Sequence, residues 1–268
     1  SFTDRLGLIN QPPYPYWLDH ANLDRAGANF TLNAHYLGAL EDFSQLLKWL
    51  EEKEANVYAE RASLLKNSLR EYFWNEKEGL FADALLEFGL SNKYSEHTNG
   101  MALALKIASV DQGKSIVEKL LANDPNLFIK RSTGMTIVTP ALSYFLHQGI
   151  AYYGDVDASF DLLRKRFDHM LAPQHNGTLW EEWWLDGTGR SGKFDPRQTR
   201  SDAQTESAFI PALFAEFLLG IKPSKPGMVE MSLELPKTKI TKITSTIPSP
   251  MGGVSVKWNC TLSKNKSL

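Results

Sequence analysis

Cysteine is almost absent from this chain of 268 residues, which contains Cys260 alone. A single thiol cannot form an internal disulfide, so nothing in the sequence requires an oxidising compartment. One cysteine and six scattered histidines also lack the ligand spacing of a structural zinc site. We therefore expect neither a disulfide framework nor a bound metal.

Long hydrophobic runs and an excess of charge of either sign are missing as well. The sequence contains no run of about 18 apolar residues, the least that a membrane-spanning helix needs. The formal net charge is −2, so no basic surface argues for a nucleic acid or an anionic membrane as partner. The length is sufficient for a sizeable core, in one large domain or in one with a small appendage.

Apolar residues recur at helical spacing through most of residues 1–222. A stripe spaced i, i+3, i+4 and i+7 predicts that one face of a helix from about 28 to 53 is buried. Its members are Phe43, Leu46, Leu47 and Leu50. A second helix with the same pattern ends near 74–75, and the later ones are expected at 97–107, 110–122, 135–153, 155–171 and 203–221. Gly154 and Asp155 are expected to separate two of them, as stop signal and N-cap.

The periodicity changes from helical towards alternating after the proline-rich linker at 222–227. Residues 229–235 and 253–258 alternate between apolar and polar side chains, which predicts a small antiparallel β element of about three strands. So few strands must pack against the helices to be stable. We expect a helical domain over 1–222 and a β-sandwich-like segment over 223–268.

The segment 178–184 places three tryptophans around two glutamates, Glu181 and Glu182. Flat indole faces beside a carboxylate suit a sugar-cleaving site, because they provide a stacking platform and a proton-transfer group. The alternative is that the tryptophans belong to the core and the glutamates to a solvated edge. The local pattern leaves both interpretations open.

Further motifs precede and follow this segment in order. Downstream are Arg200, Ser201 and Asp202, then Gly220, Ile221, Pro223, Pro226 and Gly227. Upstream are Trp-Leu-Asp-His at 17–20, Asp-Arg-Ala-Gly at 24–27, Asn-Ala-His-Tyr-Leu-Gly-Ala-Leu at 33–40 and Ser-Glu-His-Thr-Asn at 95–99. From Trp17 to Trp258, this order resembles the C-terminal part of the catalytic domain of bacterial α-L-rhamnosidases, glycoside hydrolase family 78.

The resemblance implies a mainly α fold, an (α/α)6 barrel of helical hairpins, followed by a β-sandwich. The helices expected here account for about half of such a barrel. The helical domain is therefore expected to be a partial barrel that is incomplete at its N-terminus, as a fragment of a larger enzyme or a drastically shortened relative. The alternative is that the irregular stretches at 75–95 and 172–200 contain further helices. Exposed faces of a partial barrel would be large and apolar, and self-association of the chain is therefore expected.

The resemblance also implies inverting hydrolysis of terminal rhamnosyl linkages without a cofactor. In the inverting mechanism one carboxylic acid protonates the glycosidic oxygen and a carboxylate on the other face activates water. By position Glu181 matches the general base of the family, against the alternative of a surface glutamate. Trp180 and Trp183 could form aromatic walls of the sugar site, whereas Glu182 is expected to be structural.

Several positions depart from the family pattern. His20 stands where the family has tryptophan and Gln204 where it has a substrate-contacting histidine, so both are candidate substrate-binding residues of altered chemistry. Asp19 keeps the family type and could bind sugar hydroxyls. Asp202 also keeps it, although an aspartate before an apolar helix is expected to be an N-cap. The motif that carries the general acid of the family is not found in the sequence.

Three functions remain open from the sequence. The first is the C-terminal portion of an α-L-rhamnosidase-like glycoside hydrolase. The second is a degenerate or truncated carbohydrate-binding module without activity, which the absent acid and the changes at 20 and 204 favour. The third is a helical-barrel glycosidase for another sugar, because fold alone does not fix the substrate. The sequence leaves a secreted, periplasmic or cytoplasmic location in a bacterium open.

Overall fold

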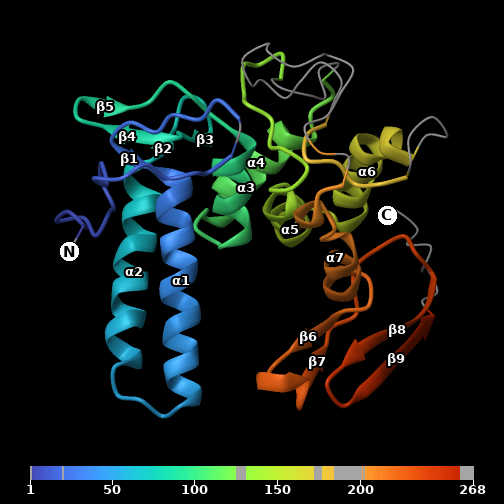
Figure 1. Ribbon diagram of the computed structural model, residues 1–268. Coiled ribbons are helices and arrows are strands. Elements are labelled where there is room, and N and C mark those ends of the chain that lie inside the picture. The colour runs from blue at the N-terminus through green and yellow to red at the C-terminus, as the bar shows by residue number, and fades with distance from the viewer. Residues whose placement is uncertain are drawn as a thin grey trace, which may run out of the picture.

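The computed structural model describes residues 2–19, 21–124, 131–171, 177–183, 201 and 203–259, which contain seven α-helices and nine short strands (Figure 1). The helices are α1 (Phe30–Trp49), α2 (Ala55–Tyr72), α3 (Glu96–Ala104), α4 (Val110–Leu121), α5 (Tyr144–Tyr153), α6 (Val156–Phe167) and α7 (Ile210–Phe217). The strands are β1 (Ala28–Asn29), β2 (Trp74–Asn75), β3 (Leu80–Phe81), β4 (Ala84–Leu86), β5 (Gly89–Leu90), β6 (Ile221–Pro223), β7 (Met231–Leu233), β8 (Lys242–Ser249) and β9 (Gly252–Asn259). The fold is mainly α, with helical hairpins followed by a small antiparallel β element, as the sequence predicts.

Helices α1 and α2 form an antiparallel hairpin whose closed end extends away from the other elements (Figure 1). Asn29 caps α1 by accepting a hydrogen bond from the backbone N–H of Leu32 at 2.8 Å. The expected burial of the stripe in the C-terminal half of α1 is wrong, because Phe43, Leu46 and Leu50 are 42%, 45% and 61% exposed. The core lies at the other end of the hairpin, and self-association through the exposed face stays a prediction.

Helices α3 and α5 cross at close range in the first core, the cluster of buried apolar residues that contains Leu103 and Leu146. The crossing is possible because glycines stand at the contact. A Cβ atom on Gly149 would lie 2.5 Å from the Cβ of Leu103, and one on Gly100 would lie 2.9 Å from the Cα of Leu146. The same core receives α1, α2, α4 and the strands from β2 to β4.

The helix expected over 135–153 begins only at Tyr144. Residues 140–143 form a turn, and the non-helical stretch 135–139 before it passes beside the start of α3, where the carbonyl of Thr136 accepts a hydrogen bond from the backbone N–H of Glu96 at 2.9 Å. Pro140 adds a local reason, because proline disfavours the helical conformation of the residue before it. The shorter helix leaves residues 136–139 free to line the region described below.

The last helix, expected over 203–221, spans only Ile210–Phe217. Its start is late because the backbone N–H of Gln204 is bonded to the tryptophan-rich segment rather than to a helical turn. Its end is early because Gly220 has a φ of 72°, and a Cβ there would lie 1.8 Å from the carbonyl oxygen of Glu234. The N-cap position of α7 is Phe209, and Asp202, the N-cap expected from the sequence, lies outside the described residues.

The C-terminal strands form two hairpins, β6–β7 and β8–β9, that lie beside α7 (Figure 1). They pack on the helices as so small an element requires. The indole N–H of Trp258 donates to the carbonyl of Leu218 at 3.0 Å, and Ile243 packs against the second core. That second core joins α6 and α7 to Trp180 and Trp183.

The irregular stretch before α3 contains short strands, β2 to β5, that the sequence pattern does not predict.

None of the helices within the described ranges combines the length and the apolar character that crossing a membrane requires.

Replacing Gly149 by alanine should destabilise the fold, because the added methyl group has no room between α3 and α5. We expect a loss of about 1–3 kcal/mol in the free energy of unfolding, the usual cost of overpacking. The matched control is Gly38→Ala on α1, where the nearest atom to an added Cβ is 4.0 Å away. That change should stabilise the helix by about 0.5–1 kcal/mol. Urea unfolding of both variants checks the difference, and equal stabilities would contradict the close crossing.

Candidate active site

The segment that carries Glu181 lies beside the residues leading into α7. The backbone N–H of Glu181 donates to the carbonyl of Ser201 at 3.1 Å, and that of Gln204 donates to the carbonyl of Leu179 at 2.8 Å. The hydroxyl of Ser207 donates to the carbonyl of Trp180 at 2.7 Å. The structure therefore brings together two of the motifs that the sequence places far apart, and it leaves the side chains of Glu181 and Gln204 partly exposed.

The two tryptophans that flank the glutamates are buried in the second core. Trp180 is 4% exposed and Trp183 is 0% exposed. The ring of Phe167 meets the indole of Trp183 edge-on, with centroids 4.8 Å apart. The indole N–H of Trp183 donates to the carbonyl of Val138 at 2.5 Å. These contacts anchor the segment on both sides of Glu181, and they favour packing over sugar stacking for the two indoles.

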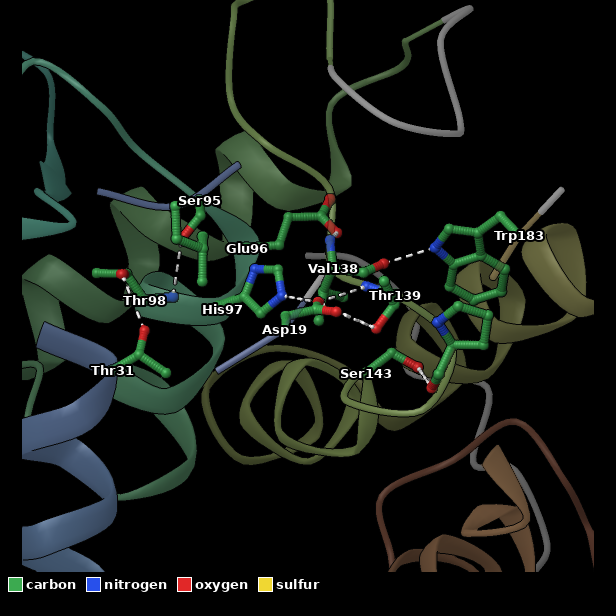
Figure 2. A network of polar contacts seen from close by, with 12 residues as sticks. Asp19, Thr31, Ser95, Glu96, His97, Thr98, Val138, Thr139, Ser143 and Trp183 are labelled. Atoms are coloured by element: carbon green, nitrogen blue, oxygen red, sulfur yellow. Dashed lines mark hydrogen bonds and ion pairs between the residues drawn. The ribbon is translucent and has the colours of Figure 1, made fainter. Parts of the chain in front are cut away.

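Asp19 lies in a sealed polar cluster rather than on an open surface. Its carboxylate pairs with Nε2 of His97 on α3 and accepts hydrogen bonds from the hydroxyl of Thr139 at 3.0 and 3.1 Å (Figure 2). Asp19 and His97 are 3% and 4% exposed. The Trp-Leu-Asp-His motif, the Ser-Glu-His-Thr-Asn motif and the 136–139 segment thus meet at one place.

Asn99 of the same motif is buried and hydrogen-bonded. Its side-chain amide accepts a hydrogen bond from the backbone N–H of Phe81 at 2.9 Å and donates to the carbonyl of Phe81 at 3.1 Å. Its role is therefore to attach β3 to the start of α3.

Glu96 sits at the centre of a buried ion-pair cluster with Arg131 and Arg166. Both terminal nitrogens of Arg166 donate to the carboxylate at 2.7 Å, and Nε of Arg131 donates to it at 2.8 Å. The backbone N–H of Val138 adds a fourth bond at 3.2 Å. This full set of donors satisfies a carboxylate that has no solvent exposure.

The charges of the two arginines control the titration of Glu96. Burial by itself raises the pKa of Glu96, but the charge and hydrogen bonds of Arg166, and then those of Arg131, outweigh it and lower the pKa from 4.5 to about 2. Because the folded state holds the lower pKa, Glu96 stabilises the fold above about pH 4.5, and this contribution is lost as the pH falls towards 2.

His147 on α5 is a second buried titratable group, next to this cluster. Burial, and then the charge of Arg166, lower its pKa from 6.5 to about 3. Its ring stacks on Phe209 with centroids 6.2 Å apart. Within the described part of the chain, neither ring nitrogen has a hydrogen-bond partner. His147 is therefore a neutral side chain that is packed like an apolar one.

The remaining predicted positions divide into those that the structure describes and those that it does not. Glu182 is 1% exposed, which agrees with the structural role expected for it. His20, Asp202 and Trp184 lie outside the described residues. Within the described ranges, no group of three or more histidine, cysteine, aspartate or glutamate side chains is placed to hold a metal ion.

Sequence reasoning missed the residues that hold these motifs together. Arg166 carried a signal, because it follows Val156, Ser159 and Leu163 on the buried face of α6, where a charge requires a partner. Thr139 carried none, since its contact with Asp19 spans 120 positions of sequence.

Comparison with known proteins identifies the fold. The chain is similar to the family 78 rhamnosidase of Bacillus sp. GL1, with a TM-score of 0.79, 24% identity and 98% of the chain covered. The chain has the fold of the aligned part of that enzyme. The rhamnosidase of Klebsiella oxytoca with rhamnose bound is similar with a TM-score of 0.60 and 17% identity over 79% of the chain. The α-L-rhamnosidase of Aspergillus terreus is similar with a TM-score of 0.61 and 19% identity over 84%.

The alignments span only part of each of these enzymes, namely 27%, 38% and 25% of their chains. A family model described as Trehalase matches residues 27–140, which run from the strand before α1 to the residues before α5. No curated protein matches the sequence. The expected fold of helical hairpins is thus confirmed, with the resemblance to family 78 rhamnosidases.

Replacing His147 by leucine should remove a pH dependence from the stability of the fold. In the wild type the imidazole of His147 has a pKa of about 6.5 in the unfolded state and of about 3 in the folded state. Between these two pH values the unfolded state therefore binds a proton that the folded state does not. The free energy of unfolding should therefore fall with decreasing pH, by up to about 1.4 kcal/mol per pH unit from this group. Urea unfolding between pH 6.5 and 4.5 should show a flatter profile for His147→Leu, and at pH 7 the variant should be no less stable. Parallel profiles would contradict the buried neutral histidine.

Proposed function

We propose that this chain provides the general-base part of an inverting glycoside hydrolase that removes terminal α-L-rhamnosyl groups. The observation that carries the proposal is the fold match to a family 78 rhamnosidase over 98% of the chain. Within that fold, the Thr-Leu-Trp-Glu segment brings Glu181 to a partly exposed position between two buried tryptophans. The bound rhamnose in the Klebsiella oxytoca enzyme supports a deoxyhexose as the substrate class.

In the proposed mechanism the carboxylate of Glu181 takes a proton from water as the water attacks the anomeric carbon. A general base must be reachable by water and held still, because its contribution depends on hydrogen-bonding geometry. Partial exposure meets the first requirement, and the anchoring of Trp180 and Trp183 meets the second. The acid that protonates the leaving group is not identified among these 268 residues.

The other predicted site residues have different proposed roles, either in contacting the sugar or in shaping the site. Gln204 is partly exposed next to the Glu181 segment, so its amide is assigned to hydrogen bonds with sugar hydroxyls. His20 stays a proposed sugar contact. Asp19 is surrounded by protein donors, and we assign it to shaping the site rather than to direct contact with the sugar.

A second function is carbohydrate binding without hydrolysis. Gln204 favours it, because an amide in place of the histidine of the family cannot carry a proton to or from the substrate. Both functions need the surface around Glu181 and Gln204 to bind a sugar. They differ in whether Glu181 then catalyses its hydrolysis.

Replacing Glu181 by glutamine should remove hydrolysis while leaving the fold intact. The assay is release of p-nitrophenol from p-nitrophenyl α-L-rhamnoside, whose leaving group departs without protonation because the nitro group stabilises its anion. We expect slow release by the wild type and a decrease of about 10²–10⁴-fold in Glu181→Gln, the usual contribution of a general base. The matched control is Glu206→Gln, an exposed carboxylate in the same region, which should retain the wild-type rate.

Full activity of Glu181→Gln would contradict the assignment of the base. If the wild type releases no p-nitrophenol, titration with L-rhamnose by calorimetry distinguishes the two functions. Binding without turnover would support the carbohydrate-binding alternative, and the absence of both would contradict both.

A further inference from the structure

The geometry points to Glu96 and Arg166 as positioning residues for Glu181, acting through the indole of Trp183. This inference rests on the proposed function for its catalytic consequence, although the packing that carries it is independent of that function. Neither residue reaches an open surface, since Glu96 and Arg166 are 0% and 1% exposed. They can influence a reaction only through the groups that they hold.

The first connection runs through the backbone of Val138. The carboxylate of Glu96 accepts a hydrogen bond from the N–H of Val138 at 3.2 Å, and the carbonyl of Val138 accepts one from the indole N–H of Trp183 at 2.5 Å. One peptide residue therefore bridges the carboxylate and the indole. Figure 2 shows Val138 between Glu96 and Trp183.

The second connection runs through the guanidinium group of Arg166. That group is bidentate to Glu96, and its central carbon lies 5.8 Å from the centroid of the Trp183 ring. A cation at this distance is attracted to the face of an indole, most strongly where water is excluded. The position of the indole thus depends on where Glu96 holds the guanidinium.

Glu181 is two residues from the anchored tryptophan, so the chain between them spans at most about 7 Å. On its other side the carbonyl of Trp180 is bonded to the hydroxyl of Ser207 at 2.7 Å. A shift of Trp183 would consequently move the base, and a displacement of about 1 Å in an active site can cost about 10²-fold in rate.

Stability alone does not require charges at this place. Ion pairs buried in a core are often no more stabilising than apolar side chains of the same volume, because their desolvation is costly. Their geometry, however, is directional, since the planar fork of arginine matches a carboxylate in one orientation. Because the guanidinium is held in one orientation, its contact with the indole of Trp183 also has a fixed geometry.

The test is Arg166→Lys, which keeps the charge and loses the fork. The matched control is Arg164→Lys on the same helix, at an arginine whose side chain is 71% exposed. Two readouts are needed. The first is the exchange of the Trp183 indole N–H with D₂O, followed by ¹H–¹⁵N spectroscopy and assigned with Trp183→Phe. The second is kcat and KM for p-nitrophenyl α-L-rhamnoside.

We expect exchange of the Trp183 indole N–H to be about tenfold faster, or more, in Arg166→Lys, while the indole of Trp258 keeps its wild-type rate. We expect kcat to fall by about 10–100-fold with KM little changed, because the base is displaced and not the binding surface. Arg164→Lys should match the wild type in both readouts.

Wild-type exchange and wild-type kcat in Arg166→Lys would overturn the inference. A lower kcat with unchanged indole exchange would also overturn it, since the effect would then bypass Trp183. If the wild type has no turnover, the proposed function fails, and the exchange rate still decides whether Arg166 fixes Trp183. If Arg166→Lys does not fold, Trp183→Phe removes the bond to Val138 and weakens the contact with Arg166, and wild-type kcat in that variant would overturn the inference.

Discussion

The pairing of Glu96 with Arg131 and Arg166 is the interaction on which the arrangement of this protein depends. A carboxylate without solvent exposure is tolerated only when its oxygens are paired. Here the partners come from α6, which carries Arg166, and from the 131–139 segment, which provides Arg131 and the backbone of Val138. Glu96 is linked to both cores, because it bonds to the backbone of Val138, a member of the first core, and to Arg166, which contacts Trp183 of the second. A neighbouring histidine stays neutral partly because Arg166 is charged. Charge placement, rather than apolar packing alone, therefore sets how the two cores meet.

Much of the fold could be predicted because its signals are local. Helices α4 and α6 begin where Ser109 and Asp155 provide N-caps, and their apolar stripes face the core. The late start of α5 had a local signal in Pro140. The late start of α7 could not be predicted, because its cause is the bond between the backbone of Gln204 and that of Leu179. The exposed stripe of α1 is a failure of another kind. Periodicity tells which side of a helix is apolar, and it does not tell whether a neighbour covers that side.

The candidate site was accessible from the sequence as a set of motifs but not as a geometry. The order of the motifs indicated that Glu181, Gln204 and Asp19 belong together, and the structure places the first two on adjacent segments. The local pattern could not decide whether the indoles face a sugar or the core, since both roles use the same side chains. Burial of Trp180 and Trp183 makes them supports of the segment that carries Glu181, the proposed base, and only tertiary contacts reveal such a role.

The measurement that tests this account most directly is a double-mutant cycle between Glu96 and Arg166. Glu96→Gln, Arg166→Gln and the double variant are compared with the wild type by urea unfolding at pH 7. Each single change should cost about 3–5 kcal/mol, because it leaves a buried charge without its partner. The double change should cost less than the sum by about 2–3 kcal/mol, the coupling expected of groups in direct contact. Additive losses would contradict the account, because Glu96 would then not be held by Arg166.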